Sequence, residues 1–315
     1  MTNLVFDKDS VWVVNVQVAT VWTSKESARI IDEPGLSNPT DIEHWVTKLT
    51  QEQKTALCGE NRVQSQLLYG EVVEVTEIDG GWAHIVIPSQ PSHKDSRGYP
   101  GLVPIAQLQK IGKTYWNQPK SAAIVSKKAW LEADQGENFL KLSYMTCLPV
   151  LNEHPKKIEV ATPHGTKFLP NETVHIYDTH QGLEKKNGDE IVKSGEQFLS
   201  LAYFWGGMSS FGYDCSGFSY ATHKACGYQI PRDASDQAEA GEPVEIENLF
   251  PGDLLFFAYE EGKGTLHHVG VYYGEGKMIH SRTNGKLIEI IELKGTIYEE
   301  ELCAARRYWN DENAG

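Results

Sequence analysis

Residues 203–218 decide the fold and read Tyr-Phe-Trp-Gly-Gly-Met-Ser-Ser-Phe-Gly-Tyr-Asp-Cys-Ser-Gly-Phe. Asp214 is a favourable N-cap because its carboxylate can accept hydrogen bonds from the free N–H groups at a helix start. Gly227 is a typical residue just beyond a helix end. We therefore predict a helix from Asp214 to Ala225. Cys215 then lies in the first turn, where the helix dipole and the free N–H groups favour a thiolate, the nucleophilic form.

The neighbours of this cysteine favour a functional role over that of a buried, inert residue, although most isolated cysteines are inert. Small Ser216 and Gly217 would let a substrate approach, and N–H groups of the same turn can face a developing oxyanion. The aromatic-Gly-Gly segment before it contains Trp205, which either lines the substrate site or belongs to the core. We predict that Cys215 is the nucleophile.

A general base is expected from the strand-like segment 267–273. Its alternation places His268, Gly270 and Tyr272 on one face. A glycine beside His268 leaves that face open to another element. We therefore predict His268 as the base and His267 as a structural or solvent-facing residue.

His280, in the next predicted strand, can orient the imidazole of His268 by bonding one of its ring nitrogens. Residues that pair directly across a hairpin share a face, so His280 reaches that face only if paired residue numbers have an even sum. A four-residue loop between Tyr273 and Met278 would give an odd sum. We therefore expect a three- or five-residue loop, or a bulge.

A helical insertion is predicted within the first β region, at about residues 38–60. Two capping-box patterns indicate its helix starts, Thr40 with Glu43 and Thr50 with Gln53. On either side, residues 11–22 alternate as one strand, and Asp-Gly-Gly at 79–81 predicts a hairpin.

The predicted fold is multidomain, with two small all-β barrels followed by an α+β domain. The boundaries are 1–113 for the first barrel, 114–180 for the second and 181–315 for the α+β domain. Residues 181–190 are charged and aperiodic, and they mark the main boundary. Beyond them helices come first, and strands are predicted at 254–257, 269–273, 277–281 and 287–293.

The composition excludes several classes of protein. The 315 residues include 29 Lys and Arg against 43 Asp and Glu, a net charge of −14. Such an acidic chain is a poor partner for nucleic acid. No apolar run is long enough to span a membrane. Histidines and cysteines lack the close spacing of zinc ligands, so no metal or other cofactor is expected.

The five cysteines are odd in number and include no C-x-x-C pair, which indicates a reducing compartment. Residues 1–9 lack the basic and apolar regions of a secretory signal. We expect a cytoplasmic monomer. The alternative is an exported or wall-associated protein whose signal has been trimmed.

In order and spacing, these motifs resemble the NlpC family of papain-like cysteine peptidases, which cut bacterial cell-wall peptides. The segments that carry the resemblance are Tyr203–Gly207, Asp214–Phe218, Ile230–Asp233, Pro251–Phe257, His268–Tyr272 and Ile279–Ser281. They cover about residues 190–310. The two upstream β regions, with Tyr69-Gly70-Glu71 and Tyr99-Pro100-Gly101, resemble the tandem bacterial SH3-like domains of YkfC-type members.

The resemblance implies a catalytic triad of Cys215, His268 and His280. It implies that Tyr203 is a side-chain oxyanion donor beside the N–H of Cys215. The further substrate-binding residues on this basis are Asp214, Ser216, Trp205, Asp233, Tyr99 and Glu71.

The resemblance also implies the substrate. In YkfC-type members the first barrel closes one end of the cleft and requires a free N-terminal L-Ala. The bond cut would then join γ-D-Glu to the diamino acid of L-Ala-γ-D-Glu-diamino acid murein peptides. A bound ammonium is expected to neutralise Asp214, whose charge otherwise opposes ionisation of Cys215.

Two alternatives stay open. The same triad suits an amidase or acyltransferase on another amide or ester, because the thioester intermediate is common to these reactions. A cell-wall-binding protein without activity is the other, and the intact cysteine and two histidines argue against it.

Overall fold

The computed structural model describes residues 8–310, which fold into two compact units. The first unit takes residues up to 89, then 97–182 and 209–211. The second takes 90–96, 183–208 and the residues from 212 onward. The ends of the predicted domains 1–113 and 181–315, at residues 1–7 and 311–315, lie outside the described residues.

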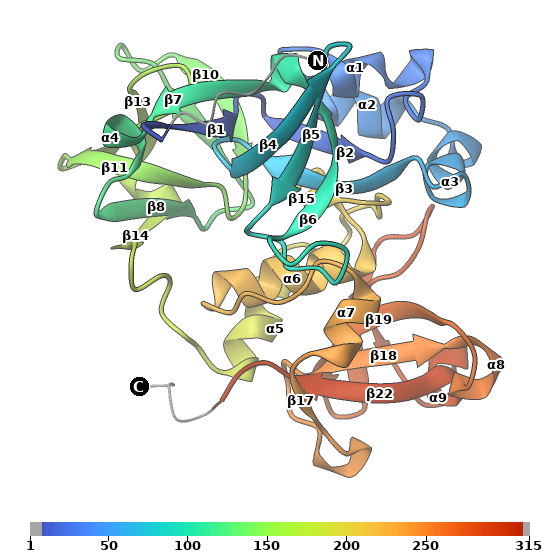
Figure 1. Cartoon of the computed structure of the whole chain (residues 1–315). Helices are drawn as coiled ribbons and strands as arrows, with labels where there is room; N and C mark the ends of the chain where they lie inside the picture. Colours follow the sequence, from blue (N-terminus) through green and yellow to red (C-terminus); the bar gives the residue numbers. More distant parts are fainter. Residues whose placement is uncertain (1–7, 311–315) are drawn as a thin grey trace. The chain divides into compact units, whose positions relative to one another are not determined.

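Two seven-stranded antiparallel sheets form the first unit (Figure 1). The strands of the first are β1 (Ser10–Val14), β2 (Val18–Trp22), β3 (Val63–Leu68), β4 (Val72–Asp79), β5 (Trp82–Ile87), β6 (Tyr99–Pro104) and β7 (Leu108–Gly112). The strands of the second are β8 (Lys120–Ile124), β9 (Lys128–Glu132), β10 (Asn138–Ser143), β11 (Cys147–Glu153), β12 (Lys157–Val160), β13 (Lys167–Pro170) and β14 (Val174–Asp178).

The two sheets share one topology. Their strand orders are β3-β2-β6-β5-β4-β1-β7 and β10-β9-β13-β12-β11-β8-β14, so adding seven to each number of the first gives the second. A short 3-10 helix precedes the last strand in both, η2 (Ile105–Gln107) and η3 (Asn171–Thr173). The tandem arrangement is therefore a structural repeat, although no close sequence repeat accompanies it.

A shared apolar core joins the two sheets of this unit. Ile111 of the first sheet and Tyr69, just after β3, pack in one buried cluster with Leu148 of the second sheet and with Trp116, which lies between the two sheets in sequence. Gly70 has φ +79°, and a Cβ there would lie 2.7 Å from Leu148 Cδ2. Glycine is therefore required by both its backbone conformation and this close approach.

The helical insertion lies between β2 and β3, as predicted. It contains η1 (Ile30–Asp32), α1 (Glu33–Leu36), α2 (Ile42–Lys48) and α3 (Gln51–Gly59). The capping box of Thr50 with Gln53 is confirmed at the start of α3. The box predicted for Thr40 with Glu43 is wrong, because α2 starts one residue later. Its N-cap is Asp41, whose carboxylate accepts from the N–H of His44.

One further expectation for the first unit needs correction. The single strand predicted at 11–22 is divided into β1 and β2, because the chain turns where the N–H of Asn15 donates to the carbonyl of Gln107. A short helix, α4 (Lys113–Trp116), follows β7, and its Trp116 is buried in the shared core.

The second unit combines a six-stranded sheet, in the order β17-β22-β18-β19-β20-β21, with several helices. The strands are β17 (Glu242–Pro243), β18 (Leu254–Ala258), β19 (Leu266–Gly274), β20 (Lys277–Ser281), β21 (Ile288–Glu292) and β22 (Leu302–Arg307). The helices are α5 (Gly188–Glu196), α6 (Cys215–Ala225), α7 (Ala234–Glu239), η4 (Ile246–Asn248), α8 (Tyr259–Gly262) and α9 (Ile297–Glu301). Two short strands, β15 (Met208–Ser209) and β16 (Gly212–Tyr213), precede α6.

The strands predicted in the α+β region are confirmed by β18 to β21. Strand β22, which lies between β17 and β18, escaped prediction because its residues, Leu-Cys-Ala-Ala-Arg-Arg, do not alternate. The order of all-β before α+β structure is as predicted. The boundaries at 113 and 180 stay a prediction.

Helix α6 is the central helix of the second unit. Residues 216–223 are all buried, and the helix packs against β19, β20 and α5. A helix buried on all sides is held in place by its whole surface. This packing brings its first turn to the strand that carries the predicted base.

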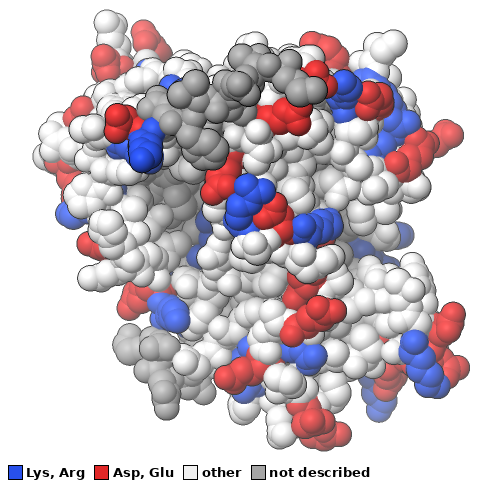
Figure 2. All heavy atoms as spheres, in the orientation of Figure 1, with Lys and Arg blue, Asp and Glu red and all other residues white. Residues whose placement is uncertain are grey.

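Charged side chains of both signs are interspersed on the face of the molecule shown in Figure 2. In the part of the chain that the structure describes, no helix is long and apolar enough to cross a membrane. The five cysteines, all within the described residues, are free thiols.

Buried His223 in α6 makes stability depend on pH. Its Nδ1–H donates to the carbonyl of Ser219 at 2.8 Å, and its ring meets Tyr308 edge to face. Burial lowers its pKa to about 4. In the unfolded chain this imidazole takes up a proton near pH 6.5, whereas in the folded protein it does so only near pH 4. The free energy of unfolding therefore falls as the pH drops from about 6.5 to 4.

Between pH 7 and pH 4.5, the free energy of unfolding of the wild type should fall by up to about 3 kcal/mol more than that of His223→Leu. Urea unfolding at both pH values measures this difference. Exposed His44 offers the matched control, and His44→Gln should leave the pH dependence unchanged. An equal change in the free energy of unfolding with pH in wild type and His223→Leu would contradict the expectation.

Candidate active site

The helix predicted from Asp214 is confirmed, and Cys215 is its first residue. The Asp214 side chain caps the helix by accepting from the N–H of Gly217 at 2.6 Å. A Cβ at Gly217 would lie 2.1 Å from the carbonyl oxygen of Gly207, so glycine is required for this approach. Cys215 is partly exposed at the start of a helix whose next eight residues are buried.

The buried Asp214 carboxylate is the centre of a hydrogen-bond network. It accepts from five donors: the N–H of Gly206 at 3.0 Å, the N–H of Gly217, the Ser216 hydroxyl at 3.3 Å, and Arg232 Nη1 and Nη2 at 3.3 and 2.7 Å. A carboxylate offers about four lone-pair sites, so these donors use its capacity. One carboxylate thus fixes the helix start and the preceding loop together.

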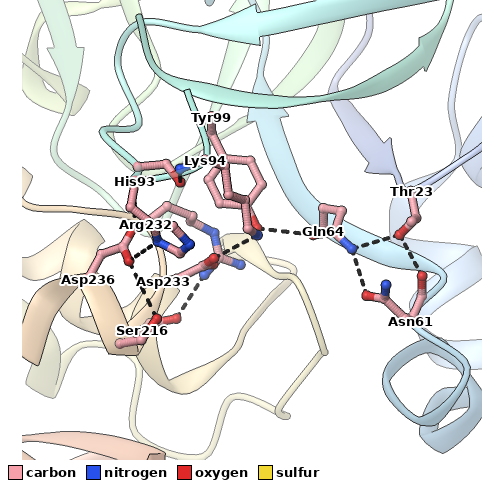
Figure 3. A network of polar contacts seen from close by, with 12 residues as sticks. Thr23, Asn61, Gln64, His93, Lys94, Tyr99, Ser216, Arg232, Asp233 and Asp236 are labelled. Carbon is pink, nitrogen blue, oxygen red and sulfur yellow. Dashed lines mark hydrogen bonds and ion pairs between the residues drawn. The ribbon is translucent and has the colours of Figure 1, made fainter. Parts of the chain in front are cut away.

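Arg232 supplies the positive charge beside Asp214. Its guanidinium is buried with the carboxylate and also donates to the Ser216 hydroxyl at 2.8 Å (Figure 3). The expectation that a bound ammonium neutralises Asp214 stays a prediction, although a positive charge already lies beside this carboxylate. A protein side chain already provides that charge in the absence of substrate.

His268 and His280 lie side by side in β19 and β20. His268 Nε2 and His280 Nδ1 are 2.7 Å apart, and both rings are buried. The expected bulge is confirmed, because the register shifts between Tyr272 and Gly274 at the hairpin end. The contact needs glycine at position 270, where a Cβ would lie 3.2 Å from His280 Cβ.

Both imidazoles are neutral at pH 7. Burial, and then the neighbouring cationic groups, lower the pKa of His268 well below 6.5 and that of His280 to about 3. His268 can act as a base through Nδ1 only if its Nε2–H donates to His280 Nδ1. The proton of His280 then sits on Nε2, which faces Glu289 Oε1 at 3.8 Å. This separation is too long for a hydrogen bond, so the carboxylate can favour the required tautomer only through its charge.

The Cys215 thiol is not activated in the substrate-free protein. Burial and the Asp214 carboxylate raise its pKa to about 12, while the backbones of Val269 and Ser216 and the Arg232 charge oppose the rise. Helix α6 packs against β19, and the Val269 backbone that acts on the thiol belongs to this strand, one residue after His268. Desolvation therefore opposes the thiolate that the helix start favours, and the ionisation expected for Cys215 stays a prediction.

Other predicted site residues also lie in the second unit. Tyr203 is buried, and its N–H donates to the carbonyl of Lys286 at 3.0 Å. Trp205 is half-buried in the same loop. Asp233 is the N-cap residue of α7 and pairs with Lys94 at 2.8 Å (Figure 3). Their roles stay predictions.

Glu71 and Tyr99 belong to the first unit. The half-buried Glu71 carboxylate accepts from the N–H of Leu68 at 2.7 Å and the Ser89 hydroxyl at 3.0 Å. Tyr99 is buried on β6 and donates to Gln64 Oε1 at 3.2 Å (Figure 3). Glu71 is therefore more ordered than a solvated surface charge, and substrate binding by both residues stays a prediction.

Sequence reasoning missed several polar residues around the site. Arg232 lies in a segment noted for its resemblance, yet nothing local assigns it to Asp214. Gln237 donates to the carbonyls of Ser216 and Pro231 at 3.1 and 2.8 Å.

His267, predicted as a structural or solvent-facing residue, is structural in part, because its Nε2 pairs with Glu301 at 3.0 Å. Within residues 8–310, no three His, Cys, Asp or Glu side chains form a candidate metal site.

A helix-start cysteine beside a hydrogen-bonded histidine pair on adjacent strands defines a papain-like cysteine peptidase. The NlpC/P60 family model matches residues 200–307, and the model of the second SH3-like domain of YkfC-type proteins matches 124–177. The chain belongs to the NlpC/P60 family. The predicted fold, two SH3-like barrels followed by the peptidase domain, is thereby confirmed.

Two curated relatives extend the similarity along almost the whole chain. The gamma-D-glutamyl-L-lysine dipeptidyl-peptidase of Bacillus subtilis is 43% identical over 93% of this chain and 97% of its own. The Bacillus cereus enzyme of the same name is 36% identical over 96% and 92%. A crystal structure of an NlpC/P60 family protein from Bacillus cereus, 35% identical, superposes with a TM-score of 0.91, covering 95% of this chain and 100% of that one.

The raised pKa of the Cys215 thiol predicts how its reaction with an alkylating reagent depends on pH. Because the thiol pKa is raised, the rate of modification by iodoacetamide should rise steadily with pH through about pH 9. A preformed thiolate would instead give a plateau at neutral pH. Mass spectrometry assigns the label to Cys215, and Cys215→Ser reports modification of the other free thiols.

The buried ion pair predicts a large loss of stability when one partner is removed. Arg232→Gln should lower the free energy of unfolding by about 3–5 kcal/mol, because it leaves the buried Asp214 charge without its partner. Urea unfolding measures this loss. Lys25→Gln, at an exposed ion pair, should cost less than about 1 kcal/mol.

A double-mutant cycle separates this pairing from simple loss of packing. Asp214→Asn combined with Arg232→Gln should cost clearly less than the two single changes together. Additive costs would show that the two side chains act independently.

Proposed function

We propose that this protein removes the dipeptide L-Ala-γ-D-Glu from murein peptides by hydrolysing the bond between γ-D-Glu and an L-diamino acid. The observation that carries the proposal is similarity over nearly the full chain, both barrels included, to two enzymes named gamma-D-glutamyl-L-lysine dipeptidyl-peptidase. The constellation of Cys215, His268 and His280 supports it, because acyl transfer to a thiol needs a nucleophile and an oriented base.

The proposed reaction starts from a neutral thiol and a neutral imidazole. Cys215 Sγ attacks the γ-carbonyl carbon of D-Glu while His268 takes the thiol proton. The N–H of Cys215 and the Tyr203 hydroxyl stabilise the oxyanion. His268 then returns the proton to the leaving amine, and water, activated by the same imidazole, hydrolyses the thioester.

The first barrel is proposed to recognise the free N-terminal amine of L-Ala. An ammonium needs an anionic partner, and Glu71 is a half-buried carboxylate held by two hydrogen bonds. Tyr99, through its contact with Gln64, is proposed to belong to the same site. Asp214, whose carboxylate pairs with Arg232, is proposed to contribute to the same recognition.

The substrate is proposed to be met in the cytoplasm by a monomer of this chain. Five free thiols fit a reducing compartment. Cell fractionation and the mass measured in solution by light scattering test these two points. Recovery in the wall fraction or a dimeric mass would contradict them.

Mass spectrometry of the products from L-Ala-γ-D-Glu-L-Lys and its N-acetylated form tests the proposed function. We expect release of L-Lys from the free peptide alone and no turnover by Cys215→Ala, because the variant lacks the nucleophile. Cleavage of both peptides would remove the requirement for the amine. Cleavage of neither would favour the amidase, acyltransferase or wall-binding alternatives.

A matched control is Cys303→Ala, which removes an exposed thiol distant in sequence from the nucleophile. This variant should keep the wild-type rate. Turnover by Cys215→Ala would overturn the assignment of the nucleophile.

A further inference from the structure

Arg282 lies directly after β20, beside the two catalytic imidazoles. Strand β19 pairs with β20 through Val271 with Ile279 and Tyr272 with Met278. The same register continued to the end of β20 places Arg282 across from His268. Directly paired residues share a face, so Arg282 lies on the face that carries both histidines.

A group of polar side chains surrounds this arginine. Arg282 Nη1 is 3.3 Å from Glu289 Oε1, and both side chains are 39% exposed. Glu289 pairs across the sheet with His280. The Tyr298 ring meets the rings of His268 and His280 at 5.4 and 5.2 Å, and its hydroxyl interacts with Arg282.

The leaving group must pass through this position. His268 protonates the departing amine, so that nitrogen comes within hydrogen-bond distance of its imidazole. In a peptide that ends in the diamino acid, the free carboxylate is attached to the carbon that bears the same nitrogen. The carboxylate is therefore held within a few ångströms of His268, on the face of the sheet to which the register assigns the partly exposed Arg282.

We propose that Arg282, assisted by the Tyr298 hydroxyl, binds the α-carboxylate of the leaving diamino acid and selects peptides that end in this residue. This inference rests on the proposed function and names the specificity of the same site. A guanidinium suits the role because it bonds a carboxylate through two parallel N–H groups. In the substrate-free protein, Glu289 Oε1 accepts from Nη1 of the Arg282 guanidinium.

Carboxylate binding would also assist the base. Arg282 lowers the pKa of both His268 and His280 in the substrate-free protein. A bound carboxylate offsets that charge and makes His268 a stronger base once substrate is in place. The contact between Arg282 and the substrate carboxylate would then determine both the choice of substrate and the basicity of His268.

The test compares kcat/KM for L-Ala-γ-D-Glu-L-Lys and its C-terminal carboxamide. The wild type should favour the acid by about tenfold or more, because a charge-assisted hydrogen bond is lost in the amide. Arg282→Gln should bring the ratio close to one. Arg282→Lys, which keeps a charge without the fork, should retain part of it. The ratio cancels any effect of the substitution that acts equally on both substrates.

Lys277→Gln is the matched control, because it removes a cation from the other end of β20. It should keep the wild-type ratio. Equal rates for acid and amide in the wild type would overturn the inference and leave the proposed function intact. So would a wild-type preference that persists in Arg282→Gln and Arg282→Lys. Cleavage of neither peptide by the wild type would remove the proposed function, and the inference with it.

Discussion

The buried pairing of Asp214 with Arg232 is the interaction on which the site depends. Burial of two charges is costly, and it is tolerated only where geometry and further hydrogen bonds compensate for the lost water. Here the carboxylate accepts five hydrogen bonds, and the guanidinium also reaches Ser216. The first turn of α6, and with it Cys215, is therefore held from several directions.

This arrangement makes the Cys215 thiol harder to ionise. The carboxylate that fixes the helix start also raises the pKa of the adjacent thiol, and Arg232 reduces that effect. Two neutral histidines complete the site, where an acidic third member would bring another buried charge. The resting site is therefore organised by position, and charge develops only when the thiol proton moves.

Local patterns predicted the parts of the site that depend on local geometry. The N-cap at Asp214 located the helix start, and strand alternation with a hairpin bulge placed His268 and His280 together. Arg232 and Arg282 were missed as functional residues because their partners are set by tertiary packing. Alternation also failed at β22, because its residues Leu-Cys-Ala-Ala-Arg-Arg do not alternate. The desolvation that opposes ionisation of Cys215 is likewise set by tertiary packing.

Each unit is built from pieces of chain that are separated in the sequence. The first needs residues 209–211, and the second takes residues 90–96 out of the run that forms the first. During synthesis the first unit cannot be completed until residue 211 has left the ribosome, well after its last strand, β14, has emerged. Likewise, a single cut at any linker yields two fragments that each lack a segment of their own unit. Each unit is therefore completed by a short segment that lies within the stretch of chain forming the other unit.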